Sequence, residues 1–343
     1  MTPSKSYKGV FLIITIVLLL CFVTNISLGS VLIPWMDTLK SLVGGIPGKE
    51  SWKHIIIDYR LPKAITAVIV GSGLGVSGLL MQTLFRNPLA GPFVLGISSG
   101  ASLGVALLIL GSALIGGTTA LFLVSNWGLV IAASLGSVLV LLLVMIVSVK
   151  VKDTMAILII GLMFGSITAA IVSVLSYFAP AEQLQRYIFW GFGSLGNLSW
   201  MDVLIFTIIV IAGMILAVFS IKPLNTLLLG ENYARSLGLN IKKSRFLIIL
   251  ATGLLAGSIT AFAGPIAFIG LAVPHLTRQL FHTSDHKTLI PAVMLIGSMI
   301  MLICDTISQL PGTEYTLPIN AITSLIGAPV VIWLLVRKRK MLF

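Results

Sequence analysis

Long stretches without any charged side chain constrain this chain more than any other feature. No Asp, Glu, Lys or Arg occurs in the 63 residues between Arg86 and Lys150, or in the 32 residues between Arg245 and Arg278. Barrel strands alternate apolar and polar residues over about ten positions, whereas these runs stay apolar for about twenty, the length of a membrane helix. Only 9% of the 343 residues are charged, against roughly 25% in a soluble domain. The sequence therefore predicts an all-α polytopic membrane protein.

We expect about ten membrane-spanning helices in a single domain covering residues 1–343, with the N- and C-termini in the cytoplasm. An uncharged interval of 63 residues suits two crossings, since about 20 residues span the ~30 Å hydrocarbon core. The predicted spans are 9–33, 61–83, 93–113, 127–149, 154–178, 203–221, 246–262, 266–277, 288–310 and 317–336. This topology puts 16 of the 22 Lys and Arg residues on the inner side, the bias expected of membrane proteins. The net charge of +12 then indicates contact with the lipid bilayer and not with nucleic acid.

Two connecting segments and a short repeat complete the predicted architecture. The glycine-rich segment 111–119 is expected to form a hairpin between two spans. Residues 179–202 are expected to form an outside loop, with Tyr187, Trp190 and Trp200 as anchors at the membrane interface. The triplet Ala-Gly-Pro ends at Pro92 and again at Pro265, 173 residues apart, each time after a helix rich in small residues. This repeat suggests two inverted halves.

The most specific pattern lies between Arg60 and Ala101. Its parts are Arg60-Leu-Pro-Lys63, Gln82, Arg86-Asn-Pro-Leu-Ala90 and Leu95-Gly-Ile-Ser-Ser-Gly-Ala101. The pattern resembles the permease subunits of the ATP-driven importers for cobalamin, haem and ferric siderophores, also called type II ABC importers. The segments 229–238 and 264–278 match the same family, so the resemblance covers nearly the whole chain.

The resemblance implies a transport subunit that moves a metal chelate from a substrate-binding protein into the cytoplasm by alternating access. A ferric siderophore is favoured as the substrate, with haem and cobalamin as the alternatives. The implied assembly, in the bacterial cytoplasmic membrane, is a homodimer with two ATP-binding cassette subunits and an extracytoplasmic binding protein. The sequence does not distinguish a homodimer from a heterodimer with a related permease.

The chain is not expected to be an enzyme. Gly48-Lys49 resembles the end of a phosphate-binding loop, but Val43 stands where the first glycine is required and Glu50 stands where Ser or Thr is required. We therefore expect no catalytic residue, metal or cofactor in this chain, and ATP with Mg²⁺ on the separate ATPase subunit.

Residues 222–245 are the least membrane-like segment of the sequence. Their charge and periodicity by themselves allow a solvated loop at the membrane surface. The resemblance implies instead a coupling segment whose short helices contact the ATPase subunit. The predicted contact residues are Leu228, Gly230, Glu231, Ala234, Arg235, Leu237 and Gly238.

The resemblance also implies residues for docking and for the pathway. Arg60 and Lys63 match positions that meet acidic groups of the binding protein, although both could simply reach the membrane interface as long cations do. At Gln309 and Thr316 the chain departs from the family pattern, so one docking charge is expected to be missing. The predicted gate and pathway residues are Asn87, Leu89, Thr154, Met155, Gly161, Gly165 and Ser166. From composition alone, Asn87 could cap a turn, and the glycines of span 154–178 could pack against another helix.

An ion-coupled secondary transporter is the alternative function. Such carriers usually hold acidic residues or histidines inside their spans, and here only Asp305 lies well within one, near its outer end. This argues against ion coupling but leaves sodium bound by backbone carbonyls open. His282 and His286 flank Asp285 at a spacing that could hold a metal. Because no further ligand lies near them in the sequence, we expect His282 and His286 to be solvated. We expect a structural role for His275.

Overall fold

The computed structural model describes residues 7–111, 125–151 and 154–336, which form helices and no strand. The elements are α1 (Lys8–Ser27), α2 (Trp35–Leu42), α3 (Glu50–His54), the π-helical turn η1 (Ile55–Arg60), α4 (Leu61–Leu84), the 3-10 turn η2 (Pro92–Leu95), α5 (Ile97–Ile109), α8 (Asn126–Lys150), α9 (Thr154–Phe178), α10 (Ala181–Gly191), α11 (Trp200–Phe219), α12 (Ile221–Leu227), α13 (Glu231–Ser236), α14 (Ile241–Ala263), α15 (Ile269–Phe281), α16 (His286–Ser308) and α17 (Ile319–Val336).

The number of apolar helices agrees with the predicted architecture. Seven helices of the described chain are long and apolar enough to cross a bilayer, and α5 and α17 are shorter apolar helices. The 13-residue helix α15 takes the place of the short span predicted at 266–277. Together these elements account for the about ten predicted spans, and α9 begins and ends at the predicted residues.

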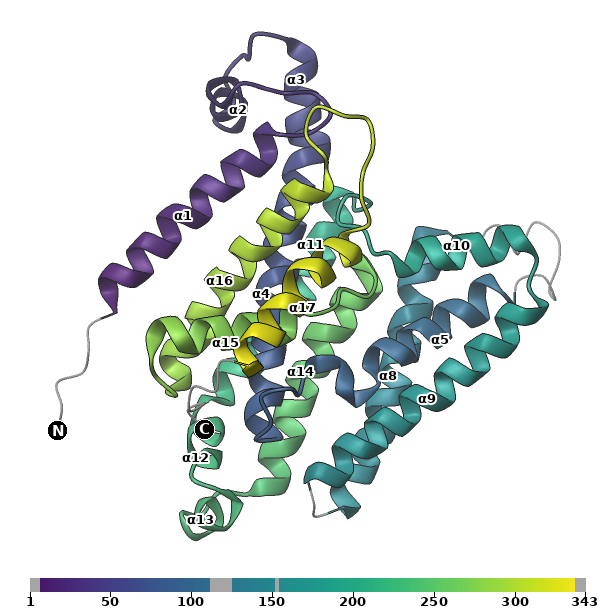
Figure 1. The fold of residues 1–343 in the computed structure, drawn as a ribbon, viewed down its shortest axis with the longest axis vertical. Coiled ribbons are helices and arrows are strands. Elements are labelled where there is room, and N and C mark those ends of the chain that lie inside the picture. The colour runs from purple at the N-terminus through teal and green to yellow at the C-terminus, as the bar shows by residue number, and fades with distance from the viewer. Residues whose placement is uncertain (1–6, 112–124, 152–153, 337–343) are drawn as a thin grey trace.

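The helices form two groups that α14 joins (Figure 1). In the first group, α4 runs through the centre and packs against α11, α15 and α16, and α1 packs on α16. In the second group, α5 packs against α8, α9 and α10. Helix α14 contacts α4 and α11 on one side and α5 and α8 on the other. Helices α12 and α13 lie at one end of the molecule, and α2 and α3 lie at the opposite end.

Close backbone contact at glycines explains why α4 can lie in the centre. A Cβ atom added to Gly78 would overlap the carbonyl oxygen of Gly270 in α15, and one added to Gly71 would overlap that of Gly297 in α16. In lipid, helices associate through such close packing because the hydrocarbon around them is as apolar as their side chains. Nearly all of α4 from Thr66 onward is therefore buried.

The two halves use equivalent elements in equivalent places. After each Ala-Gly-Pro triplet the chain forms a helix of 13 residues, α5 in the first half and α15 in the second. The short helix α15 packs against the long helix α4, and α5 packs against the long helix α14. Each long helix therefore packs against the short helix of the other half.

Two predicted boundaries need correction, and one prediction falls outside the described residues. The first span ends at Ser27 and not at residue 33. The predicted outside loop 179–202 contains the helix α10, which begins after Pro180 and stacks Tyr187 on Trp190 with ring centroids 6.3 Å apart. Pro180 is the N-cap of this helix, with an extended ψ of 147°. Of the predicted hairpin 111–119, only Gly111 lies within the described residues.

We expect the substitution Gly78→Ala to destabilise the protein, because the new methyl group would push α15 away from α4. Overpacking of this kind typically costs about 1–3 kcal/mol, and a thermal unfolding curve in detergent would measure the loss. Gly9→Ala in α1 is the matched control, since nothing lies within 4 Å of the added atom. Equal midpoints for the two variants would contradict the packing argument.

Candidate functional site

The turn after α4 holds the predicted gate residues Asn87 and Leu89. The Asn87 side-chain oxygen accepts a hydrogen bond from the backbone N–H of Leu89 at 2.9 Å. The His275 ring of α15 lies with its Nε2 atom 2.7 Å from the carbonyl oxygen of Pro88, so His275 makes a structural contact there. The turn is thereby attached to α15, while the Leu89 side chain stays 45% exposed.

The predicted coupling segment forms two short helices at the end of the bundle, α12 and α13 (Figure 1). Gly230 connects them with φ 99°, a backbone conformation that favours glycine. Ala234 is fully buried, and Glu231 forms an ion pair with Arg245 of α14 at 2.7 Å. The guanidinium of Arg86, in the turn after α4, donates to the carbonyl oxygen of Leu228 at 3.4 Å.

Several large side chains of this segment point outward. Arg235 and Leu237 are exposed, as a contact surface requires, and Leu229 and Tyr233 are exposed beside them at 60% and 57%. The sequence analysis missed Leu229 and Tyr233, because Leu229 lies between α12 and α13 and no helical periodicity places it beside Tyr233. Apolar side chains gathered at an exposed surface commonly mark a protein contact.

The residues predicted for the pathway divide between two environments. A Cβ added to Gly161 would overlap the carbonyl oxygen of Val94, and one added to Gly165 would lie 3.3 Å from the hydroxyl of Ser99. These two glycines therefore pack α9 against η2 and α5. Ser166 and Met155 are exposed, and α9 begins at Thr154, whose side chain lies outside the described part of the chain.

A cavity lined by hydroxyl groups lies where α5, α9 and α10 meet. Its volume is about 330 Å³, and its described lining contains no charged residue. Burial raises the pKa of the Tyr187 phenol, so this hydroxyl stays neutral. Six lining residues carry hydroxyl groups: Ser98, Ser99, Ser102, Thr168, Ser173 and Tyr187.

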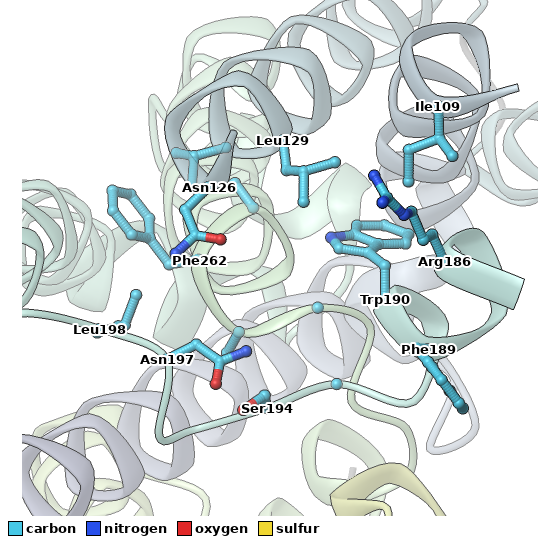
Figure 2. A pocket seen from close by; sticks show the side chains of 15 residues that line it. Ile109, Asn126, Leu129, Arg186, Phe189, Trp190, Ser194, Asn197, Leu198 and Phe262 are labelled. Atoms are coloured by element: carbon cyan, nitrogen blue, oxygen red, sulfur yellow. The ribbon is translucent and has the colours of Figure 1, made fainter. Parts of the chain in front are cut away.

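A second cavity, of about 310 Å³, lies beside α10 (Figure 2). Trp190 and Arg186 approach it from α10, and Asn126 of α8 and Asn197 of the segment before α11 lie across from them. Arg186 also pairs with Glu182 at 3.0 Å on its own helix. The cavity combines an aromatic surface with amide groups, a lining suited to a partly polar ligand.

The two predicted docking cations have partners inside the chain. The Arg60 guanidinium is buried and donates to the carbonyl oxygens of Ile26 and Ser27 at 2.8 and 2.9 Å, and also to that of Val31. These carbonyls lie at and beyond the end of α1, where a helix has unpaired acceptors and a negative dipole end. Arg60 therefore caps the C-terminal end of α1.

Lys63 forms an ion pair with Asp305 of α16 at 3.1 Å. The carboxylate is almost completely buried and also accepts hydrogen bonds from Asn25 at 2.9 Å and Gln309 at 2.8 Å. Gln309, where the chain departs from the family pattern, thus contributes to this cluster. Both Lys63 and Asp305 border a cavity of about 530 Å³ near residues 316–319.

The prediction for the histidines at 282 and 286 is half wrong. His282 is exposed as expected, but His286 is fully buried and hydrogen-bonded through both ring nitrogens to Thr83 and Asn225. No group of three potential metal-binding side chains occurs among the residues that the structure describes.

Taken together, the apolar helices and the closely packed centre define a polytopic membrane protein. Residues 17–337 match the FecCD transport family, and the chain therefore belongs to this family.

Related proteins and a solved structure agree with this assignment. A protein of Methanocaldococcus jannaschii named as an ABC transporter permease is 36% identical, with 97% of each chain covered. The hemin transport system permease protein HmuU of Yersinia pestis is 35% identical over 84% of both chains, and the vitamin B12 import system permease protein BtuC of Klebsiella pneumoniae is 36% identical over 83%. A solved inward-facing structure described as a metal-chelate type ABC transporter matches 96% of this chain with a TM-score of 0.83 and 30% identity.

The chain is thus an ABC transporter permease, a membrane transport component and not an enzyme. Membership of this class implies ATPase partners and a dimeric permease.

We expect Lys63→Met to lower the free energy of unfolding by about 1–3 kcal/mol, because the buried Asp305 carboxylate loses its cation. Thermal unfolding in detergent would measure the change, with Lys53→Met, at an exposed lysine, as the control. Combining Lys63→Met with Asp305→Asn should recover part of the loss. Wild-type stability of the single variant would show that the ion pair contributes nothing.

Proposed function

We propose that this chain is the membrane-spanning subunit of an ATP-driven importer that carries a metal chelate from a binding protein into the cytoplasm by alternating access. Support comes from three sources: HmuU is named for hemin, BtuC is named for vitamin B12, and the solved relative is of the metal-chelate type. Haem and vitamin B12 are both metal chelates. The chain is about equally similar to HmuU and to BtuC. These two comparisons therefore support metal chelates as the class of substrate and do not distinguish between haem and vitamin B12.

The observation that best supports the proposal is that the coupling segment is exposed on one side and attached to the membrane helices on the other. Its exposed residues Leu229, Tyr233, Arg235 and Leu237 form a mixed apolar and basic surface at one end of the bundle. The segment is also firmly attached to the membrane helices through the Glu231–Arg245 ion pair. A surface that contacts an ATPase must have both properties, because it must bind the partner and pass on its movement.

The proposed assembly is a homodimer of this chain with two ATPase subunits and a binding protein, in the cytoplasmic membrane of a bacterium. ATP and Mg²⁺ bind to the ATPase subunits, and this chain holds no cofactor. Docking of the binding protein at Arg60 and Lys63 requires an acidic group to compete with their internal partners. Lys63 is better suited to this than Arg60, because Lys63 borders a cavity whereas Arg60 is buried.

The proposed pathway follows α9 and ends at the turn that contains Asn87 and Leu89. Ser166 and Met155 of α9 are exposed within the single chain and are available to line a passage between two copies. Gly161 and Gly165 would act indirectly, by holding α9 against α5.

The lining of the hydroxyl-rich cavity helps to choose among the candidate substrates. Haem carries two carboxylates, which need cationic or other charged partners when they leave water. This cavity presents six hydroxyl groups, of which Thr168 and Ser173 donate to their own helix and keep only acceptor capacity, and no charged side chain in its described lining. Such a surface suits an uncharged chelate with many oxygen or amide groups, whereas Arg186 lines the neighbouring cavity. We favour a ferric hydroxamate siderophore, with cobalamin as the next candidate and haem after it.

An ion-coupled secondary transporter is less well supported. The intramembrane carboxylate of Asp305 is already occupied by Lys63, Asn25 and Gln309. Coupling to an ion requires a site that can exchange its occupant, and here the carboxylate is held by a cation of the chain itself.

The ATPase contact can be tested by co-purification. Tagged permease should retain its ATPase, and Arg235→Glu should weaken the association at least tenfold, since reversal of a contact charge typically costs a few kcal/mol and each ~1.4 kcal/mol is a factor of ten. Lys53→Glu reverses an exposed charge at the opposite end of the molecule and should leave the association unchanged. Uptake that follows an ion gradient without any associated ATPase would overturn the proposed function.

The substrate can be tested with the reconstituted complex. Binding proteins loaded with a ferric hydroxamate, cobalamin or haem are added in turn, and ATP hydrolysis is measured. We expect the ferric hydroxamate to stimulate hydrolysis most and haem least, because the cavity lacks a described cation for the propionates. Strongest stimulation by haem would contradict this assignment.

A further inference from the structure

A network of hydrogen bonds runs from the coupling segment into the centre of the membrane domain. It begins at Asn225 of α12, whose amide nitrogen donates to Asp285 at 2.7 Å. The amide oxygen of Asn225 accepts from the backbone N–H of His286 at 3.0 Å and lies 2.6 Å from the Nδ1 atom of the same histidine. Asn225 therefore joins α12 to the beginning of α16.

The same histidine joins α16 to α4 and α15. Its Nε2 atom lies 2.9 Å from the hydroxyl of Thr83, and that hydroxyl accepts from Arg278 of α15 at 3.4 Å. Arg278 also donates to the side-chain oxygen of Gln82 at 3.1 Å. Gln82, Thr83 and His286 are all fully buried. Four helices thus meet at His286 and its neighbours.

The proton positions follow from the partners. The amide oxygen of Asn225 can only accept, so in a neutral His286 the Nδ1 atom carries the proton and the Nε2 atom accepts from Thr83. The Thr83 hydroxyl also lies 2.9 Å from the carbonyl oxygen of Leu79, and its single proton serves one of these two acceptors at a time. When that proton points to His286, the bonds run in one direction, from the Arg278 guanidinium to the Asp285 carboxylate, and each bond polarises the next.

Helix α15 itself connects this network to the turn that contains Asn87 and Leu89. His275 lies one helical turn before Arg278 on α15 and contacts the carbonyl oxygen of Pro88 at 2.7 Å. A displacement of α12 that keeps its bond to His286 must carry α16 with it. Because α4 and α15 share the same network, the displacement also reaches the turn between α4 and η2.

We propose that Asn225 and His286 are positioning residues that transmit movement of the coupling segment to the turn at residues 86–90. This inference rests on the proposed function, since it assumes that an ATPase moves α12. The physical reason is the cost of leaving buried donors and acceptors unpaired, which makes it unfavourable for α12 to move independently of α4, α15 and α16. Apolar contacts alone would permit sliding, whereas this network does not.

An exchange of amide and carboxylate tests the proposal. Asn225→Asp keeps the shape of the side chain but places two carboxylates in contact, because the donor to Asp285 is lost. Adding Asp285→Asn supplies an amide donor to the new carboxylate at position 225. In the wild-type protein one oxygen of Asp285 accepts from both Asn225 and the backbone N–H of Lys287, so the new amide must turn its nitrogen to position 225 and its oxygen to the start of α16, where asparagine caps as well as aspartate does. Asn240→Asp is the matched control, since Asn240 only caps α14 through its side-chain oxygen.

The complex is reconstituted in liposomes, and the amount of substrate imported per ATP hydrolysed is measured together with ATPase co-purification and the thermal unfolding midpoint. We expect Asn225→Asp to lower the import ratio about five- to tenfold, the size of a typical coupling between sites, while the ATPase still binds. The double variant should recover the ratio, and Asn240→Asp should match wild type.

An unchanged ratio in Asn225→Asp, or a loss that Asp285→Asn does not restore, would overturn the inference. Loss of ATPase binding in Asn225→Asp would also overturn it, because Asn225 would then act in the contact itself. Failure of the wild-type protein to import substrate with ATP would instead overturn the proposed function, so the two failures are distinguishable.

Discussion

Direct backbone contact between helices, made possible by glycine, is the constraint on which the rest of the structure depends. Gly71 and Gly78 bring α4 against the backbones of α16 and α15, and in lipid such packing replaces the hydrophobic effect as the force between helices. The close approach also brings polar side chains of these helices within reach of one another. The hydrogen bonds among Gln82, Thr83 and Arg278 follow from this geometry.

Charged side chains in this protein hold the fold together as well as serving function. Arg60 closes the end of α1, Lys63 neutralises Asp305, and Arg245 holds α13 through Glu231. A charge inside a membrane protein is costly unless it has a partner, so each of these groups is paired within the chain. Any partner protein that uses Lys63 must therefore compete with a bond that already exists, which makes docking depend on the balance between two carboxylates.

The sequence predicted the spans well because an apolar run of about twenty residues has few other possible structures. It failed at α10, since an amphipathic helix at the membrane surface has no long apolar run. It also failed at His286, because a histidine between charged residues in a short loop gives no sign of burial. The partners of His286, namely Thr83 and Asn225, lie 203 and 61 residues away in the chain, and no local pattern connects them.

By itself the sequence determined that this chain is a helical membrane protein, where its long apolar segments lie, and which family it resembles. These properties depend on local hydropathy, prolines and short motifs, which can be recognised without knowing any contact. Only the tertiary structure decided the role of each residue that the motifs had singled out. It packed Gly161 against the backbone at Val94, buried Arg60 at the end of α1 and joined Asn225 to His286. Burial and hydrogen bonding are properties of neighbours in space, and the sequence lists only neighbours in the chain.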